Sequence, residues 1–174
     1  FLQGMYRSAN YVLFVNYERF IAEMEATLIR HQGESVYFFS GYDSDSLALD
    51  SVTDFVSSFM PLLEAHEQAW IELRTKSVSV RPLLKLAAHP RCVVAFSLTP
   101  DPIARALEHK APTVQQRIRA MAQLAGAGWS IGLRFDPLIL HEGYQQNYEA
   151  LFEAVFSAIP AEAIHSVSLG PLRF

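Results

Sequence analysis

Hydrophobic and polar positions follow two alternating periods along this chain, and each change of period marks a new element. Five short apolar runs rich in β-forming residues predict strands at residues 36–40, 69–73, 92–96, 130–135 and 164–169. Between them, apolar residues spaced by about 3.6 positions predict helices at residues 17–30, 47–65, 80–88, 113–125 and 144–159. Strands and helices in this alternating order predict a parallel sheet flanked by helices.

Capping and breaking residues set the expected ends of these elements. Thr113 is expected to cap the helix that follows it, and either Thr99 or Asp101 is expected to cap a helix after the third strand. Pro61 should bend or divide the second helix, and Pro137 should interrupt the fourth strand.

Two parallel architectures fit this order, an open doubly wound sheet and part of a barrel. No glycine-rich phosphate loop follows a predicted strand, because Gly126 and Gly128 come at the end of a helix. Polar residues recur instead at several strand exits, as they do at the C-terminal rim of a barrel. The sequence therefore predicts an α/β fold of the partial TIM-type barrel class with outer helices, forming one domain over residues 1–174.

Three strand exits carry polar side chains that would converge on this rim: Ser44 with Asp45, Thr75 with Lys76, and Ser97. An ammonium group and hydroxyls suit a carboxylate, whereas Asp45 suits an amino or sulfonium group, so together they could clamp an amino acid. A simpler interpretation has Ser44 and Asp45 capping a helix, Lys76 in solvent and Ser97 capping a turn. Spacing alone favours the simpler interpretation.

The fourth predicted strand offers two candidate substrate contacts. Asp136 stands before Pro137 at the strand exit, where it either contacts substrate or caps a loop. Arg134 alternates with Phe135, so one of the two side chains faces the barrel interior.

The residues around these exits resemble the spore photoproduct lyase family of radical S-adenosylmethionine (radical SAM) enzymes. The matching stretches run in order and cover nearly the whole chain: residues 1–3 (FLQ), 39–45 (FSGYDSD), 73–76 (LRTK), 97–100 (SLTP), 108–113 (EHKAPT) with Arg117-Ile118 after it, 127–137 (AGWSIGLRFDP) and 168–174 (SLGPLRF).

The resemblance implies an incomplete barrel of about six parallel strands, with the first strand and a cluster-binding loop lying before Phe1. It implies S-adenosylmethionine and a [4Fe-4S] cluster as cofactors, the cluster being held by three cysteines upstream of this chain. Ser44, Lys76 and Ser97 then stand where the family contacts the methionyl end of S-adenosylmethionine. Glu108 and Arg117 match the family's crossover pattern as a buried ion pair. The implied activity is a radical-initiated lyase reaction that repairs pyrimidine lesions in DNA.

Two positions depart from the family pattern. Tyr42 stands in place of a cysteine that donates a hydrogen atom, and it is either a substitute tyrosyl donor or a residue that lines the site. Phe1 stands in place of a tyrosine of the radical relay, and phenylalanine has no O–H group. These departures argue against thymine-dimer reversal and for a different substrate.

Composition bears on DNA binding, on cysteine-based sites and on the location of the protein. The formal net charge of −4 is not that of an autonomous DNA-binding domain, which is normally basic. Cys92 is the one cysteine in the sequence, so the chain alone holds neither a disulfide nor an all-cysteine cluster. No apolar run is long enough to span a membrane and no signal peptide is apparent, so a cytoplasmic protein is expected. The ends at Phe1 and Phe174 suggest a fragment truncated on both sides, which by itself is expected to be inactive.

Two other functions compete with the radical SAM enzyme. One is a non-catalytic barrel remnant that binds a nucleotide or a protein partner. The other is an ordinary barrel enzyme using acid/base chemistry, which needs paired carboxylates at strand ends, and only Asp45 and Asp136 qualify.

Overall fold

The computed structural model of the protein describes residues 13–41 and 44–171. The strands of this part are β1 (Val36–Ser40), β2 (Ala69–Thr75), β3 (Cys92–Ser97), β4 (Ser130–Leu138) and β5 (Ile164–Pro171). The α-helices are α2 (Tyr17–Arg30), α3 (Asp50–Thr53), α4 (Phe55–Ala65), α5 (Asp101–Leu107), α6 (Val114–Gly126) and α7 (Tyr144–Ala158), with short 3₁₀ turns η1 (Leu83–Lys85) and η2 (Ala161–Ala163). Each predicted strand is present, begins at the predicted residue and ends within three residues of the predicted end.

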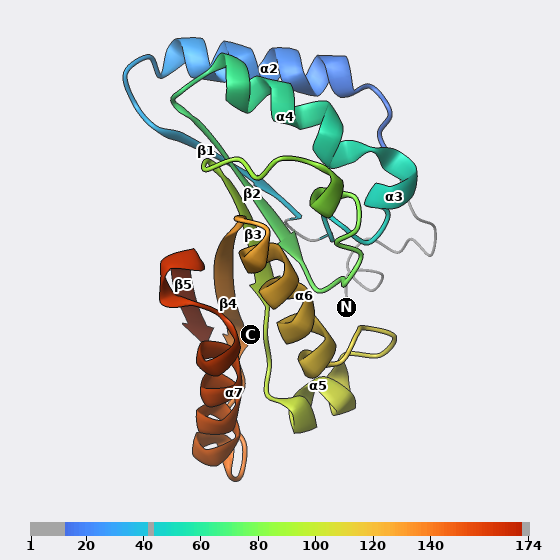
Figure 1. Ribbon diagram of the computed structural model, residues 1–174, viewed down its shortest axis with the longest axis vertical. Coiled ribbons are helices and arrows are strands. Elements are labelled where there is room, and N and C mark those ends of the chain that lie inside the picture. Colours follow the sequence, from blue (N-terminus) through green and yellow to red (C-terminus); the bar gives the residue numbers. More distant parts are fainter. Residues whose placement is uncertain (1–12, 42–43, 172–174) are drawn as a thin grey trace.

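The five strands form one sheet in the order β1-β2-β3-β4-β5, and every neighbouring pair is parallel. Figure 1 shows the helices in front of the curled sheet, on the same side of it. A doubly wound sheet would reverse its strand order and carry helices on both faces. The unreversed order and the single helical layer confirm the predicted partial TIM-type barrel. The additional strand expected before Phe1 stays a prediction.

The hydrophobic core fills the space between the sheet and the helices. Alternate strand residues belong to it, among them Ile71 and Leu73 on β2 and Val94 and Phe96 on β3. Because successive strand residues point to opposite faces, the residues between them, such as Glu72, face the concave side that carries no helix. Polar side chains that are not part of the hydrophobic core therefore line the concave side of the sheet.

The N-terminus of α6 confirms the expected cap at Thr113. The Thr113 hydroxyl accepts a hydrogen bond from the Gln116 backbone N–H at 3.3 Å, and the Gln116 side-chain oxygen accepts one from the Thr113 backbone N–H at 2.8 Å. This reciprocal capping box satisfies two N–H groups that a helix start leaves unpaired. It fixes the position of α6 directly after the loop that carries Glu108.

The helix expected over residues 47–65 is two helices, and Pro61 does not divide it. The break lies at Asp54, which has a φ of 49° and separates α3 from α4, while α4 continues through Pro61. The buried carboxylate of Asp50 accepts a hydrogen bond from the Val56 backbone N–H at 2.9 Å and holds α4 in place after the break. A residue with positive φ cannot continue a right-handed helix, so the helical segment ends at Asp54.

Three further boundaries differ from the sequence prediction. The helix expected over residues 80–88 is only the turn η1, and β4 continues past Pro137 to Leu138. Neither Thr99 nor Asp101 caps α5, whose N-cap is Pro100. Both side chains have other partners: the Thr99 hydroxyl donates to Glu108, beyond the end of α5, at 3.3 Å, and Asp101 pairs with Arg105 within α5 at 2.7 Å.

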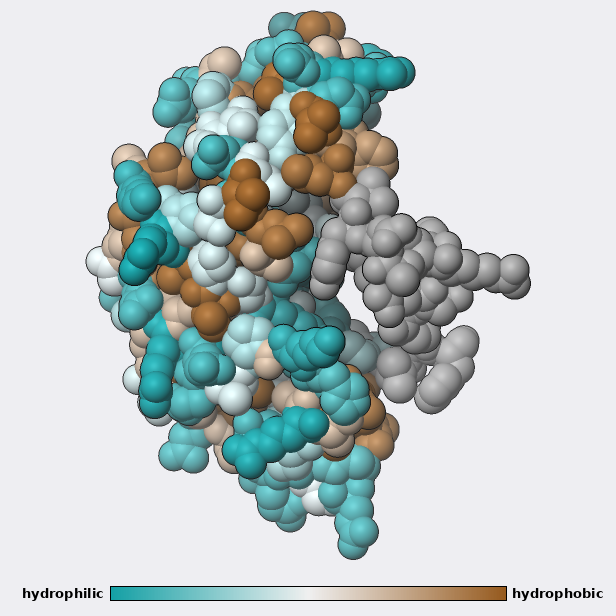
Figure 2. Space-filling model, turned by 90° about the vertical axis from the view of Figure 1, so that its right-hand side faces the viewer, coloured by the Kyte–Doolittle hydropathy of each residue, from teal (hydrophilic) through white to brown (hydrophobic). Residues whose placement is uncertain are grey.

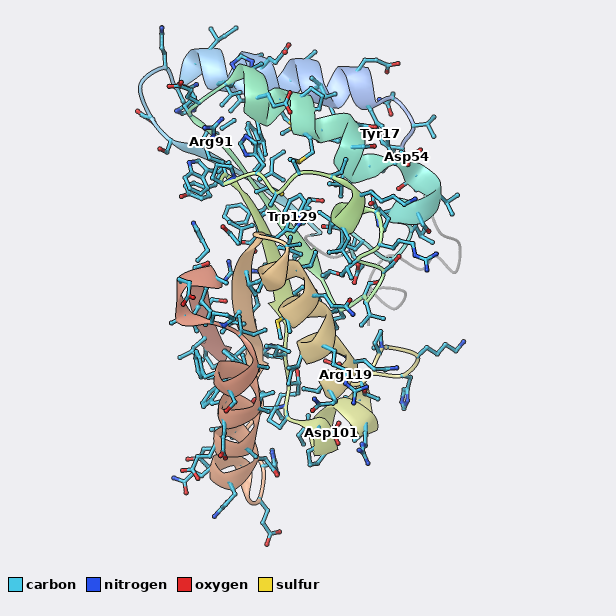
Figure 3. All side chains as sticks on the ribbon, in the orientation of Figure 1. Tyr17, Asp54, Arg91, Asp101, Arg119 and Trp129 are labelled. Carbon is cyan, nitrogen blue, oxygen red and sulfur yellow. The ribbon has the colours of Figure 1, made fainter. Side chains whose placement is uncertain are left out.

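Arg91 connects the end of α4 with the start of the sheet, as Figure 3 shows. Its guanidinium donates to the backbone carbonyls of Leu63, His66 and Ala69. Helix ends leave such carbonyls unpaired, and a cation is favoured there. Arg91 thus anchors α4 on β2 at the end of the barrel opposite the candidate site.

Candidate active site at the carboxyl ends of the strands

Asp45 joins the exits of β1 and β2. Its Oδ1 accepts hydrogen bonds from the backbone N–H groups of Leu47 and Ala48 at 3.0 and 2.9 Å and from the Thr75 hydroxyl at 2.7 Å. Its Oδ2 accepts one from the Lys76 backbone N–H at 2.7 Å. A carboxylate that already accepts four hydrogen bonds from the protein is suited to holding two loops together rather than to receiving an amino group.

Gly41 permits the close approach of these two loops. Its φ is +85°, and a Cβ at this position would lie 2.6 Å from the Arg74 carbonyl oxygen and 2.7 Å from the Ser46 hydroxyl. The Arg74 carbonyl also accepts a hydrogen bond from the Ser46 backbone N–H at 3.0 Å. Only glycine fits, so the β1 exit is pressed onto the end of β2.

Ser44 follows Gly41 and is exposed, with its backbone N–H donating to the Gly41 carbonyl at 3.3 Å. Its side chain therefore lies at the surface of the rim. Tyr42 and Phe1, the two departures from the family pattern, lie outside the described residues.

Lys76 lies in a charged group of three side chains with Glu108 and Arg117. Its Nζ donates to Glu108 Oε1 at 2.5 Å, while Arg117 Nη2 pairs with Glu108 Oε2. Arg117 is fully buried and also donates to the carbonyls of Ser97 and Pro112, both at 3.0 Å. The buried Glu108–Arg117 ion pair expected from the sequence is confirmed, and through it one arginine connects Lys76 with the end of β3.

The charges around Glu108 determine its protonation. Burial by itself raises the pKa of Glu108, but hydrogen bonds from Arg117 and Lys76 and their positive charges outweigh it and lower the pKa below its ordinary value. Glu108 is therefore ionised at neutral pH. The side chains that donate hydrogen bonds to Glu108 are those of Lys76, Thr99 and Arg117.

We expect acid to weaken this group. A carboxyl group whose pKa is lowered by folding stabilises the protein above its unfolded pKa, about 4.3 for glutamate, and loses that contribution as the pH falls through the lower folded value. The free energy of unfolding, measured with urea from pH 7 to pH 3, should fall less steeply below about pH 4.3 in Glu108→Gln than in the unchanged protein. Equal slopes in both proteins would contradict this assignment.

Ser97 is the last residue of β3 and is 9% exposed. Its carbonyl accepts from Arg117, and its backbone pairs in register with Arg134 on β4. The structure thus brings Ser97 and Lys76 to one rim. The Ser97 carbonyl is held by Arg117, and Lys76 is held by Glu108, the carboxylate that pairs with Arg117. Ser44 lies at the neighbouring exit, connected to Lys76 through Asp45.

One of the side chains of Arg134 and Phe135 was expected to face the barrel interior. Arg134 is that residue and faces the concave side, while Phe135 lies in the core. Its Nε and Nη2 contact the two carboxylate oxygens of Glu72 at 3.1 and 2.6 Å, and both side chains are 6% exposed. Nη2 also donates to the Ser166 hydroxyl at 2.9 Å. These contacts give Arg134 an organising role inside the barrel instead of a free substrate-binding group.

Asp136 accepts a hydrogen bond from the Ser168 hydroxyl at 2.6 Å and lies against Gly170. A Cβ at Gly170 would lie 2.4 Å from Asp136 Oδ1, so glycine leaves the space that this carboxylate occupies. The side chain is half-buried at the rim between β4 and β5. It stays a candidate substrate contact.

Glu72 was not singled out from the sequence, although one signal was available. It is an acidic residue inside the apolar run of residues 69–73 and is 5% exposed in the fold. Buried carboxylates are rare without a partner, so a charge inside a strand indicates an ion pair within the barrel. The partner, 62 residues away in the sequence, is visible only in the fold.

No group of three or more histidine, cysteine, aspartate or glutamate side chains arranged to hold a metal ion occurs among residues 13–41 and 44–171. Cys92 is buried, and burial raises the pKa of its thiol to about 12. This thiol therefore stays protonated at neutral pH. Within the same residues, no helix is long and apolar enough to cross a membrane.

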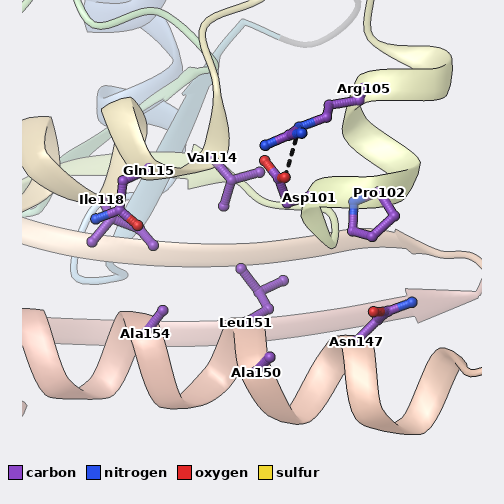
Figure 4. Close-up of a pocket in the computed structure, with 10 residues that line it drawn as sticks. All are labelled: Asp101, Pro102, Arg105, Val114, Gln115, Ile118, Asn147, Ala150, Leu151 and Ala154. Carbon is purple, nitrogen blue, oxygen red and sulfur yellow. Dashed lines mark ion pairs between the residues drawn. The ribbon is translucent and has the colours of Figure 1, made fainter.

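A cavity of about 340 Å³ lies in the helical layer, not at the rim. Figure 4 shows it between α5, α6 and α7, where the ion pair of Asp101 and Arg105 borders apolar side chains such as Val114 and Leu151. On the side of the molecule seen in Figure 2, hydrophobic and hydrophilic residues are interspersed. Neither feature adds a chemical group to the rim.

Comparison with known proteins agrees with the sequence resemblance. The family model described as spore photoproduct lyase matches residues 1–172. Spore photoproduct lyases of Bacillus subtilis (strain 168) and Geobacillus sp. (strain Y412MC61) are 24% identical over 169 residues and 23% identical over 175 residues. These matches cover 97% and 100% of this chain but 49% and 50% of the relatives, so the chain spans about half their length.

Solved structures share the fold. A doubly substituted spore photoproduct lyase with bound AdoMet (S-adenosylmethionine) and dinucleoside spore photoproduct is similar with a TM-score of 0.91 and 22% identity, over 100% of this chain and 52% of that one. A spore photoproduct lyase complexed with dinucleoside spore photoproduct gives a TM-score of 0.86 and 21% identity, over 97% and 50%. With the family model matching nearly every residue, this chain belongs to the spore photoproduct lyase family.

Proposed function

We propose that this chain forms the S-adenosylmethionine-binding barrel of a radical SAM lyase, and that Lys76, Ser97 and Ser44 contact the methionyl end of the cofactor. The excess positive charge at Lys76 is the observation that carries the proposal. Similarity to a relative that holds AdoMet supports it.

The charge count at the rim favours a single carboxylate ligand. Lys76 and Arg117 carry two positive charges and Glu108 carries one negative charge, so the group as a whole carries one positive charge. Arg117 is buried and engaged with three acceptors, which leaves the excess charge on Lys76, whose side chain is 38% exposed. An ammonium group has three donors, and Lys76 uses one of them on Glu108.

Each proposed residue has a definite task. Lys76 binds the carboxylate, Ser97 and Ser44 offer hydroxyl groups beside it, and Asp45, Glu108 and Arg117 hold these three in place. When bound, S-adenosylmethionine would supply radical initiation, the step that protein side chains do not provide. The chain's own contribution is therefore binding and orientation at the rim.

An iron–sulfur cluster does not fit the residues of this chain. Cys92 is the sole cysteine of the sequence, and its buried thiol points into the hydrophobic core. We propose that cysteines outside residues 1–174 hold the cluster, within a single partial-barrel domain of a longer cytoplasmic protein.

A pyrimidine lesion in DNA is the proposed substrate of the whole protein, since two relatives hold dinucleoside spore photoproduct. We propose that Asp136, at the β4 exit, contacts it. Tyr42 replaces the hydrogen-donating cysteine expected from the family, so we propose that the returned hydrogen atom comes from a different group or that the lesion differs.

The first test is release of 5′-deoxyadenosine from S-adenosylmethionine by the full-length protein, reconstituted with iron and sulfide and reduced without oxygen. Lys76→Ala removes a charge-assisted hydrogen bond to the carboxylate, so we expect the affinity for S-adenosylmethionine to fall roughly 10- to 100-fold and release to fall with it. Binding is measured separately by calorimetry.

Lys85→Ala is the matched control, because Lys85 is an exposed lysine in η1. It should bind S-adenosylmethionine as the unchanged protein does. A protein that takes up a cluster and releases no 5′-deoxyadenosine would contradict the proposed reaction. Failure to take up a cluster would favour the non-catalytic barrel remnant.

A further inference from the structure

A second group of charged side chains lies on the concave face, beside the rim and apart from Lys76. Glu72 on β2 and Arg134 on β4 form the buried two-point ion pair described above, across the intervening strand β3. Arg74, the next residue of β2 on the same face, has its Nη2 3.4 Å from Glu72 Oε1. Its side chain is 34% exposed, whereas those of Glu72 and Arg134 are 6% exposed.

Two small residues, Ala95 on β3 and Gly132 on β4, leave room for the Arg134 guanidinium. A Cβ at Gly132 would lie 2.9 Å from Arg134 Nη2 and 2.9 Å from the Ala95 Cβ. The Arg134 guanidinium therefore lies directly over the backbone of Gly132. A larger residue there would push the guanidinium away from Glu72.

Arg134 has no capacity left for a ligand. Besides both oxygens of Glu72, its guanidinium donates to the Ser166 hydroxyl at 2.9 Å and to the carbonyls of Leu133 and Ser166 at 3.2 and 3.3 Å. Its charge is matched by the carboxylate that it contacts at two points. Arg134 is thus a positioning residue: it fixes Glu72, which in turn contacts Arg74.

Arg74 carries the excess charge of this group. Two guanidinium groups share one carboxylate, which leaves one positive charge, and Arg74 is the more weakly paired and more exposed of the two. Over residues 13–41 and 44–171, Glu72 is the one side chain that pairs with Arg74. A guanidinium has five donors, and this contact uses one of them.

The same design occurs twice at the exit of β2. In each group a buried arginine neutralises a carboxylate, and the carboxylate then holds a half-exposed cation: Arg134, Glu72 and Arg74 in one, Arg117, Glu108 and Lys76 in the other. Arg74 and Lys76 are two residues apart, so their backbones are separated by about 7 Å. Two anionic groups could therefore be bound side by side.

We propose that Arg74 binds a phosphate group of a nucleic acid strand while Lys76 binds the cofactor carboxylate. The proposal rests on the proposed function, which assigns Lys76 to S-adenosylmethionine and so requires the second anion to belong to the substrate. A guanidinium recognises phosphate through two parallel hydrogen bonds, and each nucleotide of a strand offers one such group. Glu72 fixes the guanidinium near the concave face, and Arg134 holds Glu72 in place through its two contacts with the carboxylate.

The test compares charged and uncharged linkages in the full-length protein. The probes are two fluorescein-labelled thymidine tetranucleotides, one with phosphodiester linkages and one with methylphosphonate linkages of the same shape but no charge. We expect fluorescence anisotropy to give about 10-fold or more tighter binding of the charged probe. Arg74→Gln should remove that preference and lower the slope of log affinity against log salt by about 0.7, the value for one phosphate contact on a single strand.

Arg81→Gln is the matched control, because Arg81 is an exposed arginine that belongs to neither charged group, and it should keep both the preference and the slope. Arg74→Lys keeps the charge without the two-point geometry and should give an intermediate preference, which also covers the case in which Arg74→Gln unfolds. An unchanged preference in Arg74→Gln, or an unchanged protein that binds both probes equally, would overturn the proposal.

The two proposals fail in different ways. If the charged probe is preferred through Arg74 but no 5′-deoxyadenosine is released, the phosphate site stands and the radical SAM function does not. If 5′-deoxyadenosine is released and the probes bind equally, the phosphate site alone is wrong.

Discussion

Replacing Arg117 with methionine is expected to lower the free energy of unfolding by about 3–5 kcal/mol, the cost of leaving a buried charge without its partner. Arg117 is fully buried in α6, and its removal leaves the Glu108 carboxylate with Lys76 and Thr99 alone. The carbonyls of Ser97 and Pro112 lose a donor as well. Urea unfolding of the full-length protein measures the change.

Arg119→Met is the matched control on the same helix. Arg119 is exposed, as Figure 3 shows, and its replacement should change the free energy of unfolding by no more than about 0.5 kcal/mol. The double variant Glu108→Met with Arg117→Met removes both charges, so it should be more stable than Arg117→Met alone. If the double variant is less stable than Arg117→Met, the loss arises from packing and not from the ion pair.

Replacing Arg134 with leucine should have a similar cost, about 3–5 kcal/mol, because Glu72 then stays inside the barrel with only the distant contact to Arg74. The affinity for the charged oligonucleotide should fall too, since Arg74 would be drawn toward the unpaired carboxylate. Unfolding in urea and fluorescence anisotropy report the two effects separately.

Arg105→Leu provides the comparison for this prediction. Arg105 pairs with Asp101 at 2.7 Å on the surface of α5, with a side chain that is 76% exposed, and exposed ion pairs contribute about 0–1 kcal/mol. A loss in Arg134→Leu as small as that in Arg105→Leu would mean that water reaches Glu72 and that the pair does not organise the barrel.

Local sequence patterns predicted most of the secondary structure because apolar periodicity and capping residues act over a few positions. The run 92–96 became β3, and Thr113 capped α6 as expected. The predicted division of the second helix at Pro61 and the predicted cap at Thr99 failed for the opposite reason. A left-handed Asp54 and a hydrogen bond from Thr99 to Glu108 depend on residues brought together by packing.

The candidate site was predictable only in part. Parallel strands place their exits on one rim, so the convergence of Ser44, Lys76 and Ser97 follows from strand order. The sequence does not reveal that Asp45 is occupied by four donors, because two of them come from residues 30 and 31 positions further along the chain. Hydrogen-bond saturation is a property of the assembled loops.

The sequence by itself determined the family, the parallel barrel and the residues available at its rim, because these depend on local pattern and on the order of elements. Tertiary structure decided which charges are matched and which are left over. Arg134 looks as free as Arg74 in the sequence, yet one is neutralised at two points by Glu72 and the other only touches it. Charge pairing across a sheet depends on distances of a few ångströms between residues far apart in the chain, and only folding sets those distances.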